Sequence, residues 1–88
     1  MEEKLRLNNG TEILGDLIEE DGKLFLYMTG ISLVQAFNAL KDPDAAMRIT
    51  AAAFGQETVY SGYSHLSRIG EENGGVNAVM TKAVSNNG

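Results

Sequence analysis

Apolar residues occur in short runs along the chain, and turns rich in Gly, Asn and acidic residues separate these runs. Residues 5–7 alternate between apolar and polar, which predicts a half-buried strand, and residues 8–11 (Asn-Asn-Gly-Thr) predict a turn. A second apolar run covers residues 13–18 and a third covers residues 24–28, with an acidic turn at residues 19–22 between them. Two apolar runs joined by a short Asp-Gly turn predict a β-hairpin.

The third run is apolar on both faces of the predicted strand. Leu24, Leu26 and Met28 fall on one face, and Phe25 and Tyr27 fall on the other. A strand of this kind needs cover on both sides. A single helix covers only one side, so the other side requires a second layer or a partner.

One helix is predicted after this strand. Ser32 and Gln35 have the spacing of a capping box, and Pro43 ends the helix because the residue before a proline avoids the α conformation. Residues 44–47 are expected to add one further helical turn. The inward stripe of the helix is predicted to consist of Leu33, Val34, Phe37 and Leu40.

The second half of the chain returns to strands. Residues 48–54 are interpreted as a strand because a hairpin pattern follows them, although three consecutive alanines would also suit a helix. Residues 57–69 read as one long strand with a bulge or bend at Gly62. Residues 71–75 predict a turn, and residues 76–81 alternate as a final strand.

These elements predict an α+β fold in the order β-β-β-α-β-β-β. The expected architecture is an antiparallel sheet of about five to six strands with one packed α-helix, and a partly closed barrel is the alternative arrangement. We expect a single domain over residues 1–84 and a disordered C-terminal tail over residues 85–88.

Composition and charge limit the classes of function. The chain has 88 residues, no cysteine and a formal net charge of −5, from twelve acidic and seven basic residues. The basic residues are scattered, and a nucleic-acid binder needs a clustered basic surface, so no nucleic-acid partner is expected. No signal peptide or membrane-spanning stretch is evident, so we expect a protein that is cytoplasmic when expressed and has no membrane partner.

The residues that could carry chemistry do not form a recognisable site. Ser64 and His65 are adjacent, and neighbouring strand residues point to opposite faces, so they are not expected to share a proton. The acidic clusters at residues 19–21, 42–44 and 71–72 lack the layout of a calcium loop and are interpreted as solvated turns. We therefore predict no catalytic residues, no cofactor and no metal site.

Four aromatic residues are the candidates for an interaction surface. Tyrosine is favoured at protein interfaces because it combines a large contact area with a polar tip. Ordinary packing in the core and between strands is the competing interpretation. The candidate surface consists of Phe25, Tyr27, Tyr60 and Tyr63.

Residues 31–50, together with residues 5–11 and 60–63, resemble small uncharacterised proteins encoded in the tail modules of prophages from Gram-positive gut bacteria. The resemblance spans about residues 4–82 and rests on the layout of a strand ending in Asn-Gly, a helix ended by Asp-Pro and a Gly-Tyr strand. It implies a small phage-derived structural or accessory protein, which could be associated with the virion. It carries no catalytic residues.

Three hypotheses follow for function. The first is a non-enzymatic protein–protein interaction module that binds either itself, as a homo-oligomer, or other phage tail proteins. The second is a small acidic inhibitor that binds a basic surface of a host nucleic-acid-handling or defence protein. An enzyme is the third. Salt-sensitive binding to a basic protein would favour the inhibitor, and salt-tolerant self-association would favour the structural part.

Overall fold

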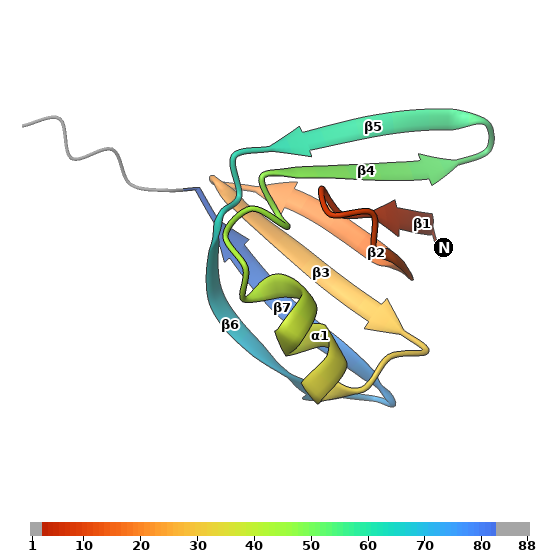
Figure 1. The fold of residues 1–88 in the computed structure, drawn as a ribbon. Coiled ribbons are helices and arrows are strands. Elements are labelled where there is room, and N and C mark those ends of the chain that lie inside the picture. The colour runs from red at the N-terminus through yellow and green to blue at the C-terminus, as the bar shows by residue number, and fades with distance from the viewer. Residues whose placement is uncertain (1–2, 83–88) are drawn as a thin grey trace, which may run out of the picture.

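A computed structural model describes residues 3–82 and shows one antiparallel sheet with a single helix. The predicted tail at residues 85–88 lies outside the described residues. Residues 3–82 form seven strands and the helix α1, and α1 lies over one face of the sheet (Figure 1). The elements are β1 (Glu3–Arg6), β2 (Glu12–Glu20), β3 (Lys23–Thr29), α1 (Leu33–Leu40), β4 (Arg48–Ala53), β5 (Gln56–Ser61), β6 (His65–Glu72) and β7 (Gly75–Thr81).

The strand order is β5-β4-β1-β2-β3-β7-β6, so β5 and β6 form the two edges of the sheet. Only residues 62–64 connect these edges, and a connection this short spans at most roughly 15 Å. The sheet therefore curls until its edges converge at this corner, and Figure 1 shows the short connection that leads from the end of β5 into β6. The sheet does not close, so the prediction of a partly closed barrel is wrong.

The predicted single strand over residues 57–69 is also wrong. It is two strands, because Gly62 adopts a positive φ of 87° and the chain leaves one sheet edge for the other at this point. The structure consequently has seven strands, more than the five to six expected. The α+β class, the single helix and the antiparallel sheet are confirmed.

Three hairpins of the sheet are closed by two-residue turns in which both residues have positive φ. These turns are Asp21-Gly22, Phe54-Gly55 and Asn73-Gly74. Such turns match the right-handed twist of the flanking strands. Phe54 is unusual because a bulky residue seldom adopts a positive φ, and its side chain is 82% exposed.

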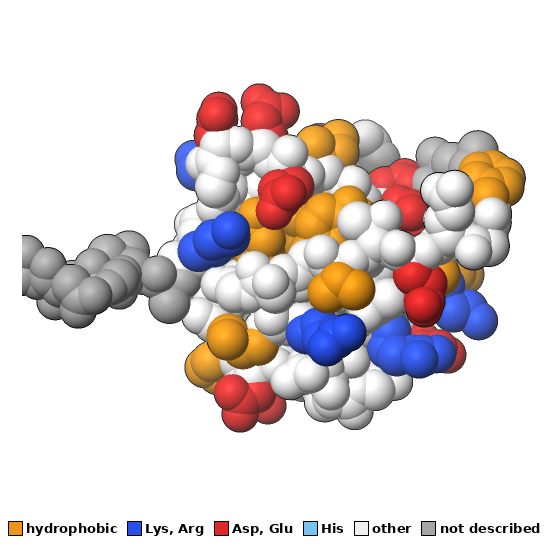
Figure 2. All heavy atoms as spheres, turned by 90° about the horizontal axis from the view of Figure 1, so that it is seen from above, with side chains coloured by type: hydrophobic (Ala, Val, Ile, Leu, Met, Phe, Trp, Pro, Cys, Tyr) orange, Lys and Arg blue, Asp and Glu red, His pale blue; other side chains and the backbone are white. Residues whose placement is uncertain are grey.

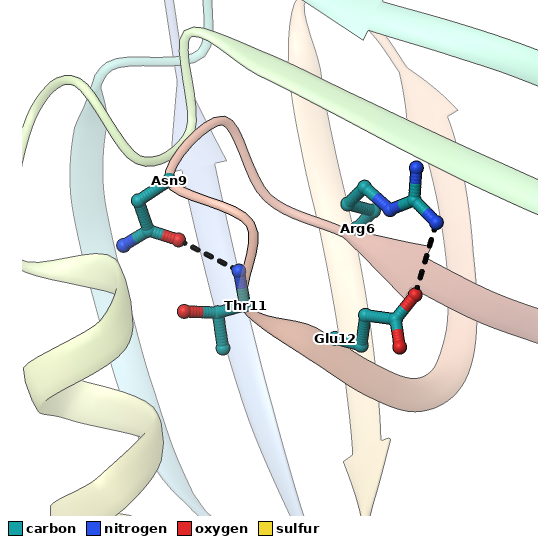
Figure 3. A network of polar contacts seen from close by, with 4 residues as sticks. All are labelled: Arg6, Asn9, Thr11 and Glu12. Atoms are coloured by element: carbon teal, nitrogen blue, oxygen red, sulfur yellow. Dashed lines mark hydrogen bonds and ion pairs between the residues drawn. The ribbon is translucent and has the colours of Figure 1, made fainter.

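The β1–β2 connection is held by side chains (Figure 3). The Asn9 side-chain oxygen accepts a hydrogen bond from the backbone N–H of Thr11 at 3.0 Å, which is an Asx turn. On the adjoining strands, Arg6 and Glu12 lie directly opposite each other and form an ion pair at 3.1 Å. The turn predicted at residues 8–11 is confirmed.

The core lies between the inner face of the curled sheet and α1. Alternate residues of β3 point into it, and this strand is apolar on both faces as predicted: Leu24, Leu26 and Met28 are buried, whereas Phe25 is 41% exposed. Within the described residues no polar or charged side chain is buried. The buried apolar residues are Leu5, Leu7, Ile13, Leu24, Leu26, Met28, Ala36, Leu40, Ala45, Ala46, Ile49, Ala51, Tyr63, Val76, Ala78 and Met80.

The helix begins with the predicted capping box. The Ser32 hydroxyl accepts a hydrogen bond from the backbone N–H of Gln35 at 3.1 Å, and the Gln35 side chain accepts one from the Ser32 N–H at 3.0 Å. The predicted inward stripe is partly wrong, because Val34 is 68% exposed and Phe37 is 44% exposed. Small Ala36 is fully buried and faces the sheet in their place.

Residues 42–47 form consecutive turns, so the additional helical turn predicted at residues 44–47 is absent from this part of the chain. The backbone N–H of Asn8 donates to the carbonyl oxygen of Ala45 at 2.9 Å, and Ala45 and Ala46 are both buried. A continued helix would have carried these alanines away from the β1–β2 turn. The described residues include no helix long and apolar enough to cross a membrane.

Candidate functional site

The outer face of the sheet, opposite α1, carries a row of apolar side chains that no described part of the chain covers. Ile18 on β2 pairs with Phe25 on β3, and Phe25 pairs with Val79 on β7, so the three side chains lie next to one another. Ile18 is 61% exposed and Phe25 is 41% exposed. We call Ile18, Phe25 and Val79 the outer-face row.

The row ends at a shallow hollow over β6 and β7. Arg68 pairs with Val79 and continues the row, and Gly70 lies one pair further along on the same face, opposite Asn77. Because Gly70 has no side chain, the space above it stays open. The hollow has a volume of about 650 Å³. Its lining includes Phe25, Arg68, Gly70, Glu72, Asn77 and Val79.

Tyr27 fixes one side of this surface. Its ring lies over Gly75, where an added Cβ would come within 2.6 Å of the ring. Its hydroxyl donates to the carbonyl oxygens of Glu72 and Asn73, at 3.3 and 3.1 Å. A glycine at the start of β7 therefore leaves room for the tip of the Tyr27 ring, whose hydroxyl reaches the β6–β7 turn.

The charged residues around the row include acidic and basic side chains, and neither kind predominates. Figure 2 shows one side of the molecule, where acidic and basic side chains are interspersed and hydrophobic ones are exposed between them. The strand registers place acidic and basic residues in equal numbers on the outer face of the sheet. These are Lys4, Arg6, Lys23, Arg48 and Arg68, and Glu12, Asp16, Glu20, Glu57 and Glu72.

The four aromatic residues predicted as one surface are divided between the two faces. Phe25 and Tyr27 lie on the outer face, as a contact surface requires. Tyr60 is partly buried and packs against the core, and Tyr63 is only 1% exposed. Tyr63 is therefore a core residue, and the prediction that it belongs to a surface is wrong.

Tyr63 ties the connection between the two sheet edges to the middle of the sheet. Its hydroxyl donates a hydrogen bond to the Glu19 carboxylate, and the Lys82 ammonium lies 5.2 Å from the centre of its ring. Burial, and then the hydrogen bond and negative charge of Glu19, raise the pKa of Tyr63 to about 12. Glu19 thus belongs to β2 and supports the fold, which corrects its interpretation as part of a solvated turn.

The other candidate groups do not converge. His65 begins β6 and is exposed, and Ser64 precedes it in the connection. In the described part of the chain, no three His, Cys, Asp or Glu residues are grouped so that they could hold a metal ion.

Sequence reasoning found Phe25 and Tyr27 but missed Ile18, Val79 and Arg68. The two-residue turn Asp21-Gly22 already implies that Ile18 lies opposite Phe25, so this pair could have been found. The pairing of β3 with β7 could not, because about fifty residues separate these strands and no turn joins them.

No protein-family model matches the chain, and neither the curated proteins nor the solved structures include a significant match to it.

Proposed function

We propose that this protein is a non-enzymatic protein–protein interaction module and that the outer-face row is its contact surface. The observation that carries the proposal is the direct pairing of Ile18, 61% exposed, with Phe25, 41% exposed, beside Val79. Contiguous apolar side chains on a sheet face are unfavourable in water, and extended apolar patches mark interaction sites.

No element among residues 3–82 packs over the outer-face row. Among residues 3–82, the helix and the inward curl of the sheet both cover the inner face, and no element covers the outer face of β3. The row also ends in Arg68 and a hollow, and aromatic residues and arginine are the side chains most enriched in interface centres. A partner's side chain could enter the hollow above Gly70.

The biological setting that we propose is a phage structural or accessory protein, on the resemblance of residues 31–50 and the flanking strands to prophage tail-module proteins. Its partner would be another tail protein or a second copy of the chain. Such a protein would be made in the cytoplasm and could enter the virion.

The acidic-inhibitor hypothesis retains some support from the net charge of −5 and from the exposed Glu71 and Glu72 beside the hollow. An inhibitor that binds a basic enzyme surface is expected to present a continuous acidic face. The outer face here carries equal numbers of acidic and basic residues, which favours the interaction module. Binding through the outer-face row should therefore tolerate salt, whereas binding of a basic enzyme should weaken steeply with it.

A site-specific cross-link tests the proposal. A photoreactive phenylalanine analogue at position 25 should form a defined protein adduct in the cells that naturally produce the protein, and mass spectrometry identifies the adduct. The matched control places the same analogue at position 54, where the native Phe is even more exposed at 82% but lies in a turn away from the row. Equal labelling from both positions would contradict the proposal.

A further inference from the structure

The free edge of the sheet at β6 offers a second surface, which borders the hollow at the end of the outer-face row. β6 is one of the two outermost strands, so one side of its backbone has no neighbouring strand. The strand is irregular between Leu66 and Arg68, near the connection to β5, and then runs regularly from Arg68 to Glu72. In this regular part Arg68, Glu71 and Glu72 are exposed. The edge available for pairing is thus residues 68–72.

The hairpin geometry determines which backbone groups face this edge. The turn Asn73-Gly74 joins Glu72 to Gly75, which is the hydrogen-bonded closing pair of a two-residue hairpin. Because hydrogen-bonded and non-hydrogen-bonded pairs alternate, residues 68, 70 and 72 direct their N–H and C=O groups toward β7. Ile69 and Glu71 direct theirs toward the free edge.

The side chains on this segment are arranged symmetrically about a glycine. Arg68 and Glu72 lie on the same face, each two residues from Gly70, and they have opposite charges. Within residues 3–82 neither side chain forms an ion pair. An antiparallel copy of the same segment is therefore complementary to it in charge.

We propose that two copies of this protein pair through β6, antiparallel, with Gly70 opposite Gly70 of the partner subunit. This register places Arg68 opposite Glu72 of the partner subunit, and the two-fold axis repeats the ion pair. Ile69 then exchanges backbone hydrogen bonds with Glu71 of the partner subunit, since both present their backbone groups to the edge. The two seven-stranded sheets become one continuous sheet.

The direction of the backbone hydrogen-bonding groups and the side-chain charges both favour this register. Arg68 and Glu72 of the partner subunit form a non-hydrogen-bonded pair, in which Cα atoms lie about 4.5 Å apart and side chains are closest. The opposite edge, β5, lacks this property, because Glu57 is the only charged residue among its six. The complementarity of β6 with itself favours a second copy over an unrelated strand.

This inference rests on the proposed function in that it names one partner of the module. It uses the sheet edge and leaves Ile18, Phe25 and Val79 free, but it shares Arg68 and Glu72 with the hollow that ends the row. Sedimentation velocity over about 5 µM to 1 mM protein measures the dissociation constant of the proposed dimer. The wild type should show a concentration-dependent dimer. Arg68→Glu and Glu72→Arg should each raise the dissociation constant by about tenfold or more, because each replaces two attractive pairs with two repulsive ones.

The double variant Arg68→Glu/Glu72→Arg provides the decisive comparison, since it restores opposite charges and should dimerise within about threefold of the wild type. Glu57→Arg makes the same charge change on β5 and should leave the dissociation constant unchanged. Glu71→Pro removes an N–H from the free edge, but none from the β7 ladder, and should abolish the dimer.

A wild type that stays monomeric throughout the range overturns the inference, and so does a double variant that dimerises no better than the single variants. A dimer that ignores these charges but is lost in Phe25→Lys would place self-association on the outer-face row. In that case the edge pairing is wrong while the proposed function stands.

Discussion

The exposure of residues along α1 predicts which substitution in the helix unfolds the protein. Leu40 is 1% exposed and sits in the core, so Leu40→Ala should lower the free energy of unfolding by about 3 kcal/mol, the loss of buried methyl groups plus the cavity left behind. Phe37 is the larger side chain but is 44% exposed. Phe37→Ala should therefore lower the free energy of unfolding by less than Leu40→Ala does.

The magnitude for Phe37→Ala follows from three contributions. Complete burial of a Phe side chain stabilises by about 2 kcal/mol, and Phe37 realises a little over half of this. The Lys41 ammonium, 6.0 Å from the ring centre, adds about 0.5 kcal/mol. The better helix propensity of Ala offsets a similar amount, which leaves a net loss of about 1 kcal/mol.

Equilibrium urea unfolding, followed by circular dichroism, measures both variants under the same conditions. Val34→Ala is the matched control, because Val34 is 68% exposed and Ala is the better helix former, so this variant should be neutral or slightly more stable. If Phe37→Ala costs as much as Leu40→Ala, then the helix faces the sheet with a different stripe and the packing described here is wrong.

Three further predictions concern the tyrosines and a close approach. Because burial and Glu19 raise the pKa of Tyr63 above its ordinary value of 10.0, its stabilising contribution is fully present below pH 10 and is lost as the pH rises toward about 12. Tyr63→Phe should flatten this alkaline fall in thermal stability, and an unchanged fall would show that other groups cause it. Tyr27→Phe should cost about 1 kcal/mol in urea unfolding, the net value of its hydrogen bonds to the β6–β7 turn, and no loss would mean that water replaces them equally well. Gly75→Ala should cost more than Gly70→Ala, because a Cβ at position 75 meets the Tyr27 ring at 2.6 Å whereas one at position 70 meets open space, and equal losses would contradict this packing.

Local signals predicted much of this fold. The Asp21-Gly22 turn, the capping box of Ser32 with Gln35 and the alternation in β7 all depend on neighbours in the sequence, and all are confirmed. The prediction failed at Phe37, because hydrophobicity alone does not show that the smaller residue Ala36 is the one that faces the core. It failed again at Gly62, where the same positive φ suits a bulge in one strand and a crossing between two sheet edges.

The residues of the candidate site also divide into those that local sequence signals predict and those that depend on long-range strand pairing. Phe25 could be recognised from the two-faced character of its strand, and its partner Ile18 follows from the hairpin register. Val79 and Arg68 complete the surface through the β3–β7 and β6–β7 pairings. The β3–β7 pairing is long-range and depends on the curl of the whole sheet, which no local pattern specifies.

The role of the outer-face row as the contact surface is tested most directly with the partner protein that the photoreactive analogue at position 25 captures. The measurement compares the affinities of two matched variants for this partner. Phe25→Lys and Phe54→Lys make the same chemical change at two exposed phenylalanines, one in the outer-face row and one in the β4–β5 turn. Titration calorimetry should show that Phe25→Lys weakens binding by about tenfold or more, while Phe54→Lys stays within about threefold of the wild type. Equal affinities for the two variants would contradict the assignment of the outer-face row as the contact surface.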